Sequence, residues 1–174
     1  MYHITEVSDD GQPCAPKKIK DTYVSQCGAI VRDNVPISYR EWKGKADNPH
    51  VVPDSVKNLL WDEILKHFTL PEGVEPNNVK HWNLTRMATQ FQKFKQQLDK
   101  DYIKKNRTPN WIEYPKLKEH WTSFVEYKKS EDFAQASARG KKSRGKKEHD
   151  HHLGRGGYAF AVPKWRKMEE DLLA

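Results

Sequence analysis

The segment between residues 84 and 102 constrains the fold of this chain more than any other. Its apolar side chains recur three or four positions apart, which places them on one face of an α-helix. They belong to Leu84, Met87, Phe91, Phe94, Leu98 and Tyr102. Asn77 or Asn78 can cap this helix at its start, and the polar run at 106–110, which includes a proline, ends it. The spacing therefore predicts one long amphipathic helix.

Further helices are predicted on either side of the first. One begins near Pro53 and Asp54, because proline and an acidic residue are both favoured in a first turn. Its apolar residues are Val56, Leu59, Leu60, Ile64 and Phe68, with Trp61 beside them. Another spans about 115–135, with Leu117, Trp121, Phe124 and Val125 on its apolar face. A short amphipathic helix is predicted at about 164–173.

These elements predict a mainly α fold with a compact three-helix core at 53–135, similar to Myb/SANT or trihelix modules. We expect a disordered tail at 1–21, where Gly, Pro, Ser and Asp occur without apolar periodicity. Residues 22–52 are expected to form an extended or looped segment packed on the core, with a short strand within 23–31. A basic linker rich in glycine and histidine follows at 136–157, and then a short strand or loop and the C-terminal helix at 158–174.

The composition limits the class of protein. Only 36% of the residues are hydrophobic, so the chain can bury one modest core. No apolar run approaches the roughly 18 residues of a membrane span, and the first residues do not resemble a secretory signal. Cys14 and Cys27 form no CxxC motif, and we expect both to be reduced thiols in a nuclear or cytosolic protein.

Positive charge is concentrated in two parts of the chain, whose formal net charge is +7. Residues 76–130 hold 12 basic and 5 acidic residues, and residues 139–167 hold 10 basic and 2 acidic residues. This asymmetry favours a polyanionic partner, most simply nucleic acid.

The side of the long helix opposite to the apolar stripe carries basic and amide residues. This basic stripe consists of Arg86, Gln90, Lys93, Gln97, Lys100 and Lys104. Lys and Arg neutralise phosphates, and Gln can pair with adenine edges in the major groove. We interpret the stripe as a candidate DNA-binding face, and an ordinary solvated helix face is the alternative.

The segment 139–147 contains six basic residues and no acid. They are Arg139, Lys141, Lys142, Arg144, Lys146 and Lys147. We interpret the segment as a flexible phosphate clamp or a nuclear-localisation signal, with a solubilising linker as the alternative. His149, His151 and His152 follow, and imidazole is a zinc ligand. A second Cys or His pair is not apparent, so we predict a polar loop, no metal site and no cofactor.

Catalysis is not predicted. A DNA transposase needs carboxylates gathered around metal ions on a mixed α/β core, and strands for such a core are missing. The glycines at 154–157 neither follow a strand nor open a helix, as a phosphate-binding loop requires. Aromatic residues such as Trp61, Trp82 and Trp121 could stack bases, but their helical spacing indicates core positions.

Several motifs resemble those of a known family. They are QCGAIVR at 26–32, VPISYREW at 35–42, LWD at 60–62, FTLPEG at 68–73, MATQFQKFK at 87–95, HW at 120–121, HHLG at 151–154 and GGY at 156–158. In this order the chain resembles the plant transposase-associated domain of the Ptta/En/Spm group, found in CACTA-type transposons. The resemblance implies a transposon-derived nuclear protein with a DNA-binding role, and it supplies no catalytic residues. Segment 139–147 is more basic than this family leads us to expect.

The sequence therefore predicts a non-catalytic protein that binds duplex DNA through a basic helix face. One alternative is a protein-interaction or oligomerisation module, in which the apolar stripe at 84–102 pairs with a second chain or with another transposon-encoded protein. Another is a genomic remnant without present function.

Overall fold

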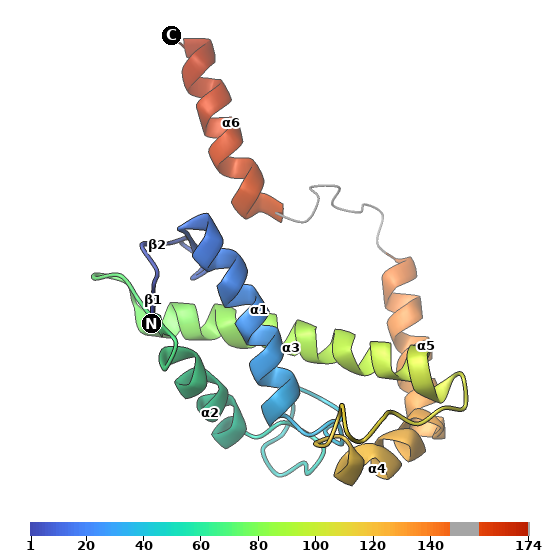
Figure 1. Cartoon of the computed structure of the whole chain (residues 1–174). Coiled ribbons are helices and arrows are strands. Elements are labelled where there is room, and N and C mark those ends of the chain that lie inside the picture. Colours follow the sequence, from blue (N-terminus) through green and yellow to red (C-terminus); the bar gives the residue numbers. More distant parts are fainter. Residues whose placement is uncertain (147–156, 174) are drawn as a thin grey trace. The chain divides into compact units, whose positions relative to one another are not determined.

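The computed structural model describes residues 1–146 and 157–173 of the chain (Figure 1). It divides into two compact parts, Met1–Ala134 and Gln135–Ala174, and each is described by itself. The described residues are mainly helical, which confirms the prediction of a mainly α fold. The helices are α1 (Lys17–Asn34), α2 (Asp54–Leu65), α3 (Pro76–Leu98), the π-helix η1 (Asp99–Ile103), α4 (Lys118–Lys128), α5 (Glu131–Gly145) and α6 (Gly157–Leu173). The strands are β1 (Tyr2–His3), β2 (Glu6–Val7), β3 (Pro13–Ala15) and β4 (Phe68–Thr69).

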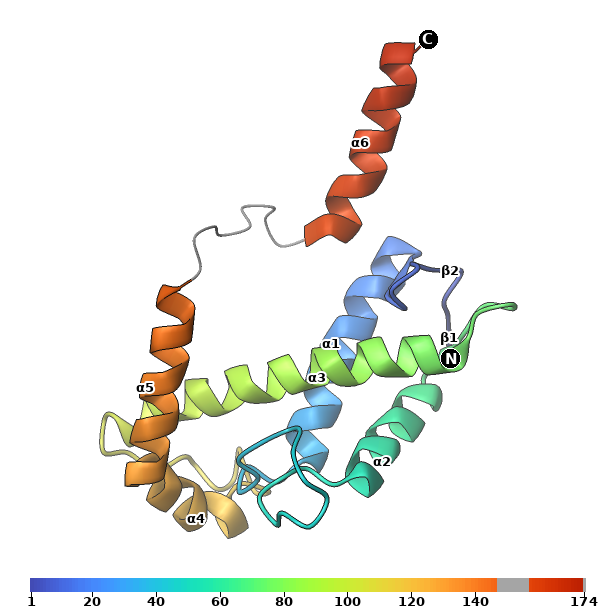
Figure 2. The ribbon, with the colours of Figure 1, turned by 180° about the vertical axis from the view of Figure 1, so that it is seen from behind.

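The centre of the N-terminal part is the packing of α1 against α2 and α3. Figures 1 and 2 show α1 crossing α3, with α2 beside them. The buried residues of α1 recur at helical spacing and are Tyr23, Cys27, Ile30 and Val31. They meet a buried face of α3 that includes Val79, Met87 and Phe91. Burying such side chains contributes roughly 1.5–3 kcal/mol each, so this contact organises the core.

The prediction of an extended segment at 22–52 is wrong for residues 22–34, because α1 occupies them. The β-branched Val24, Ile30 and Val31 favour a strand locally, but the spacing of the apolar residues that become buried is helical. Gly28 also lies against α3, since a Cβ there would be 3.3 Å from Gln90 Nε2. Residues 35–52 form the expected loop, closed by a hydrogen bond from Val52 N to Glu41 O of 2.9 Å.

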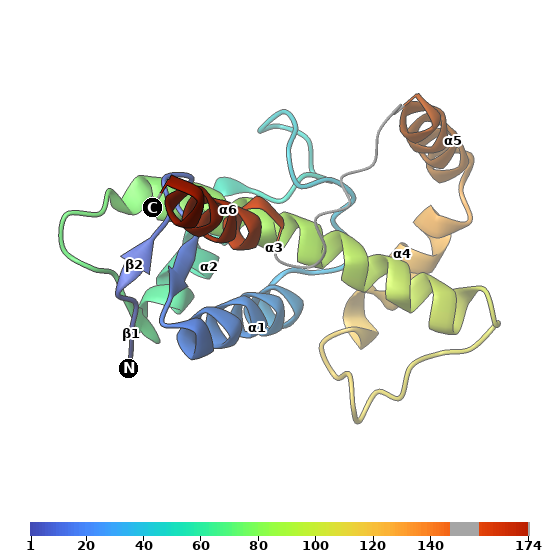
Figure 3. The ribbon, with the colours of Figure 1, turned by 90° about the horizontal axis from the view of Figure 1, so that it is seen from above.

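The prediction of a disordered tail at 1–21 is also wrong. β1 pairs in parallel with β4, and β2 pairs antiparallel with β3. Ile4 and Pro13 are buried, and Gly11, with a φ of +90°, packs on the start of α3. Figure 3 shows the N-terminal strands beside this end of α3. The strands have only two or three residues, too few to produce a visible alternating pattern.

Helix boundaries agree in part with the predictions. α2 begins at Asp54 after Pro53, as predicted. α3 begins at Pro76, and its N-cap is Glu75, whose side chain accepts a hydrogen bond from Asn77 N at 3.3 Å. The prediction of Asn77 or Asn78 as the cap is therefore wrong, because the helix already begins at Pro76 and both asparagines lie inside its first turn.

The third predicted helix, at 115–135, is two helices. α4 ends at Lys128, and α5 starts at Glu131 after a break at which Ser130 Oγ accepts a hydrogen bond from Phe133 N. Leu117, Trp121 and Phe124 are buried as predicted. They cover the distal end of α3, where the Trp121 and Tyr102 rings lie 6.1 Å apart. The predicted core boundary of 53–135 is therefore wrong, because α1 supplies the helix that packs on both α2 and α3.

The C-terminal part is more helical than predicted. The linker predicted at 136–157 is helical up to Gly145, and residues 147–156 lie outside the described ones. α6 begins at Gly157 rather than near residue 164, so the strand or loop predicted from residue 158 is wrong. α6 continues through Pro163. Among the described residues, no helix is both long and apolar enough to cross a bilayer.

Candidate nucleic-acid interface

The basic stripe on α3 and η1 is exposed at Arg86, Lys93 and Lys100. No ion pair among the described residues includes any of these three side chains. Their spacing of seven residues places them along one side of the helix. They are therefore available to neutralise phosphates.

Gln90 does not belong to the exposed face, and this correction removes one predicted DNA contact. The side chain is partly buried against α1, and its Nε2 donates to Val24 O at 2.9 Å. Its Oε1 is buried without a hydrogen-bond partner among the described residues. The amide joins two helices, because α1 lies across this part of α3.

The end of the stripe is partly neutralised by two acids of η1. Gln97 donates to Asp101 Oδ2 at 2.6 Å, and Lys104 Nζ lies 3.6 Å from Asp99 Oδ2. Asp99 and Asp101 are not members of the stripe but lie next to it, on either side of Lys100 in the sequence. Gln97 and Lys104 are exposed, but each already has a partner within the chain.

Lys95 of α3 is buried and has a structural role. It is 5% exposed and donates to Tyr39 O at 3.1 Å and to Arg40 O at 3.2 Å. Burial lowers the pKa of Lys95 to about 8, and the charge of Lys128 adds to this effect. Lys95 therefore fastens the 35–52 loop to α3 and is unavailable to DNA. Its place four residues after Phe91, on the apolar side, was the sequence signal for burial.

A buried polar group joins α1 to α3 beneath Arg86. Asn83 Oδ1 accepts from Tyr23 Oη and from Cys27 Sγ, each at 3.0 Å. Burial raises the pKa of Cys27 to about 12, and the charge of Arg86 opposes this only in part. Cys27 is therefore a protonated hydrogen-bond donor at neutral pH and not a nucleophile.

The C-terminal half of α5, together with Lys146 directly after it, carries a dense group of cations. All are exposed, and they are Arg139, Lys141, Lys142, Arg144 and Lys146. No ion pair in the described ranges includes them. A Cβ on Gly140 or Gly145 would meet nothing within 4 Å. The sixth predicted cation, Lys147, lies outside the described residues.

The charges of α5 follow its macrodipole. Glu131 and Asp132 occupy the first turn, and Lys142 and Arg144 the last. This order stabilises a helix by a few tenths of a kcal/mol per charge. The helix has no buried residue, so its cationic half is an exposed helical surface rather than part of a core.

The aromatic residues predicted as core positions pack in the core. Trp61, Phe91, Trp121 and Phe124 are buried, and Trp82 and Phe94 pack against them. Trp42 and Trp111 also pack there, since the Trp42 ring lies 6.0 Å from the Phe91 ring and the Trp111 ring lies 6.0 Å from the Trp121 ring. These rings are therefore occupied by the chain's own packing.

The apolar stripe is covered by the chain itself. Met87, Phe91 and Leu98 are in the core, and Leu84, Phe94 and Tyr102 pack against it. The alternative in which this stripe pairs with a second chain is therefore wrong. Among the described residues, no three His, Cys, Asp or Glu side chains are grouped as metal ligands, and the histidines at 149–152 lie outside those residues.

No protein family, curated protein or solved structure matches this chain in comparison.

Proposed function

We propose that the chain is a non-catalytic protein that binds duplex DNA through the cations of α5, assisted by Arg86, Lys93 and Lys100 of α3. One observation carries the proposal. Five exposed cations occupy eight consecutive positions, from residue 139 to residue 146, and no acid lies among them. These cations contribute little to the stability of the fold, because none of their side chains is buried.

The chemistry of this group fits a phosphate backbone. Duplex DNA carries one negative charge per roughly 1.7 Å of helix axis, and each phosphate neutralised by Lys or Arg releases counterions. An α-helix fits into the major groove. The cations lie all around the axis of α5, so a helix in the groove could reach phosphates on both of its walls. The two glycines leave room for close approach of the backbone.

The proposal extends to the biological setting. The motifs that resemble the plant transposase-associated domain support a transposon-encoded, non-catalytic accessory protein that acts in the nucleus. A core of α1, α2 and α3 would take the place of the three-helix module of Myb/SANT or trihelix proteins. This likeness rests on analogy of architecture, which does not by itself establish function.

The test is fluorescence anisotropy of a labelled duplex titrated with the full chain. One variant neutralises three α5 cations (Arg139→Gln, Lys142→Gln, Arg144→Gln). A second neutralises Arg86, Lys93 and Lys100 of α3. A matched control removes three exposed lysines elsewhere, namely Lys43, Lys45 and Lys118.

We expect the α5 variant to lose about tenfold or more in affinity, because it removes three phosphate contacts. The α3 variant should lose less, and the control should lose least although its net charge changes equally. Equal losses of affinity in all three variants would show that DNA is held by general charge attraction and would contradict a specific contact at α5. Absence of binding by the folded wild-type chain in low salt would overturn the proposal.

A further inference from the structure

Ser143 lies in the middle of the cationic group of α5. Its side chain is exposed, and basic residues occur within four positions of it at 139, 141, 142, 144, 146 and 147. The nearest acids along the chain are Asp132, eleven residues before it, and Glu148, five residues after it. A hydroxyl can accept a phosphoryl group, and a protein kinase with an acidic substrate cleft selects its serine by such a pattern of flanking charge.

The hydroxyl of Ser143 has no role in holding the fold together. In the described ranges of the chain, no hydrogen bond involves its Oγ. Ser130 also follows two lysines, but its Oγ donates to Tyr127 O at 2.6 Å and accepts from Phe133 N at 3.3 Å. The two residues directly after Ser130 are acidic. Ser143 is therefore the better match to a kinase that selects cations.

The end of α5 that carries Ser143 can open without disturbing a core. The helix has no buried residue, and Gly140 and Gly145 lie on either side of the serine. Glycine is a poor helix former, and segments with few buried contacts open locally at low cost. Protein kinases bind the segment around the accepting hydroxyl in an extended form. This end of α5 can therefore unwind to enter a kinase cleft and become helical again afterwards.

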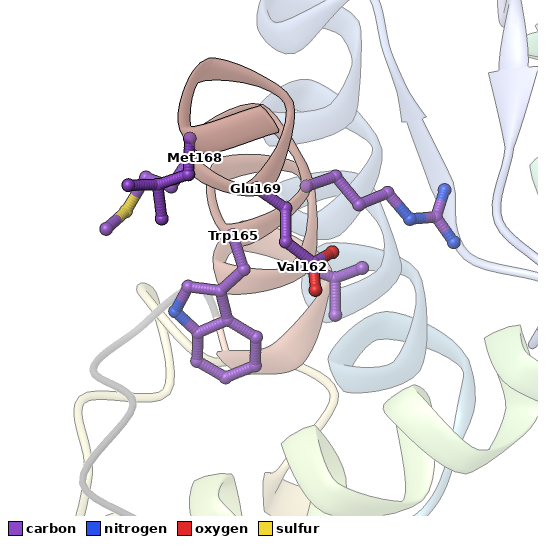
Figure 4. A pocket seen from close by; sticks show the side chains of 6 residues that line it. Val162, Trp165, Met168 and Glu169 are labelled. Carbon is purple, nitrogen blue, oxygen red and sulfur yellow. The ribbon is translucent and has the colours of Figure 1, made fainter. Parts of the chain in front are cut away.

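The other helix of the C-terminal part, α6, offers no comparable site. It contains neither serine nor threonine, and its three cations are balanced by three acids. Figure 4 shows one of these acids, Glu169, among the side chains that line a shallow depression of this helix. Residues 135–174 contain two serines, Ser137 and Ser143, and no threonine. Ser137 is partly buried, so Ser143 is the more accessible of the two.

We propose that Ser143 is phosphorylated by a protein kinase that selects basic residues on both sides of its serine, and that the phosphate releases the chain from DNA. Ser143 Oγ forms a bond to the γ-phosphorus of ATP, while the bond from this phosphorus to the oxygen that bridges the β- and γ-phosphates breaks and ADP leaves. The hydroxyl proton passes to the catalytic aspartate of the kinase. The release from DNA rests on the proposed function, whereas the phosphorylation site does not.

A phosphate on Ser143 would neutralise cations of the proposed DNA interface. It adds a charge of about −1.5 to −2 at pH 7. Arg139 lies four residues before Ser143 and Lys146 three residues after it, and residues at this spacing are neighbours on a helix surface. Both side chains can therefore pair with the phosphate. A negative group in the last turn also opposes the macrodipole, which weakens the helical form of the interface.

Incubation of the full chain with Mg²⁺, ATP and the catalytic domain of protein kinase C tests the site, because this kinase accepts basic residues on both sides of serine. Cleavage after glutamate releases residues 132–148 as one peptide, in which mass spectrometry locates the phosphate. Ser143→Ala should remove the modification of this peptide, and the matched Ser137→Ala variant should retain it. Lys141→Gln with Lys142→Gln should slow the reaction about tenfold or more. An unmodified Ser143, faster modification of another hydroxyl, or an unchanged rate in the double variant would overturn the site.

A second double variant, Gly140→Ala with Gly145→Ala, tests the opening of α5 without a change of charge. Alanine favours the helix over the open form, so phosphorylation of Ser143 should slow about fivefold or more. Circular dichroism measures the accompanying rise in helix content. An unchanged rate together with a higher helix content would overturn the opening of the helix.

Anisotropy of a labelled duplex compares the phosphorylated and unphosphorylated chains. Phosphorylation should lower the affinity about tenfold or more and make the salt dependence shallower by about 2, and treatment with a phosphatase should restore both. Ser143→Ala treated with the kinase should bind as the untreated wild-type chain does. An unchanged affinity of the phosphorylated chain would overturn the release from DNA. Absence of binding by the unphosphorylated chain would instead overturn the proposed function, and the kinase reaction would still decide the site.

Discussion

Replacing Asn83 by alanine should destabilise the fold strongly, because this amide satisfies two polar groups inside the core. Asn83 is fully buried and accepts from Tyr23 Oη and Cys27 Sγ at 3.0 Å each. Without it, a buried hydroxyl lacks a partner, at a cost of roughly 1–3 kcal/mol. The lost side-chain volume adds about 1 kcal/mol. We expect a total loss of about 3 kcal/mol in the free energy of unfolding.

The Tyr23→Phe variant separates the hydrogen bond from the packing. Alone it should cost about 1 kcal/mol, because Asn83 keeps the Cys27 thiol as a donor. In the Asn83→Ala background it should cost nothing or stabilise, because it removes the unpaired hydroxyl. Urea unfolding followed by tryptophan fluorescence measures all four proteins. A coupling energy of about 1–2 kcal/mol is expected, and strictly additive losses would refute the reasoning.

Three further predictions concern single residues. Gly11→Ala should destabilise the fold more than Gly73→Ala in urea unfolding. Both have positive φ, but only at Gly11 would the Cβ meet the α3 backbone, at 2.3 Å. Equal losses would contradict this packing. The folded pKa of Lys95, about 8, lies below its ordinary 10.5, so the unfolded chain binds more protons between these values. Stability relative to the Lys95→Met variant should therefore rise by up to about 3 kcal/mol across this window, and a flat difference in pH-dependent unfolding would contradict it. A thiol reagent should label Cys14 and leave Cys27 unlabelled in the folded chain, and mass spectrometry of labelled peptides would detect the reverse order.

The long helix and its neighbours could be predicted because their burial is periodic. The stripe from Leu84 to Tyr102 packs as its spacing required, and α2 starts where Pro53 and Asp54 indicated. α1 could not be recognised in the same way, because its β-branched residues Val24, Ile30 and Val31 favour a strand locally. The helix forms because its apolar residues pack against α3. This tertiary contact overrides the local preference of the segment and cannot be deduced from the residues of the segment alone.

The candidate interface was predictable in composition but less so in geometry. The sequence shows that basic residues are concentrated at 139–146. It did not predict that most of this segment is helical. Gln90, by contrast, occupies the stripe in a helical projection but is turned towards α1. Asp99 partly neutralises Lys104, and Asp101 accepts a hydrogen bond from Gln97, so two members of the stripe already have partners within the chain. Whether each of these side chains is available to DNA depends on its three-dimensional surroundings, which the sequence spacing does not specify.

The dependence of DNA affinity on salt tests the central claim most directly. The logarithm of the association constant falls with the logarithm of salt concentration, with a slope of about −0.9 per phosphate contact on duplex DNA. Five α5 cations predict a slope of about −4 or steeper for the wild-type chain. Neutralising Arg139, Lys142 and Arg144 should make it shallower by about 3. A wild-type slope near zero, or a slope that these substitutions leave unchanged, would contradict the account.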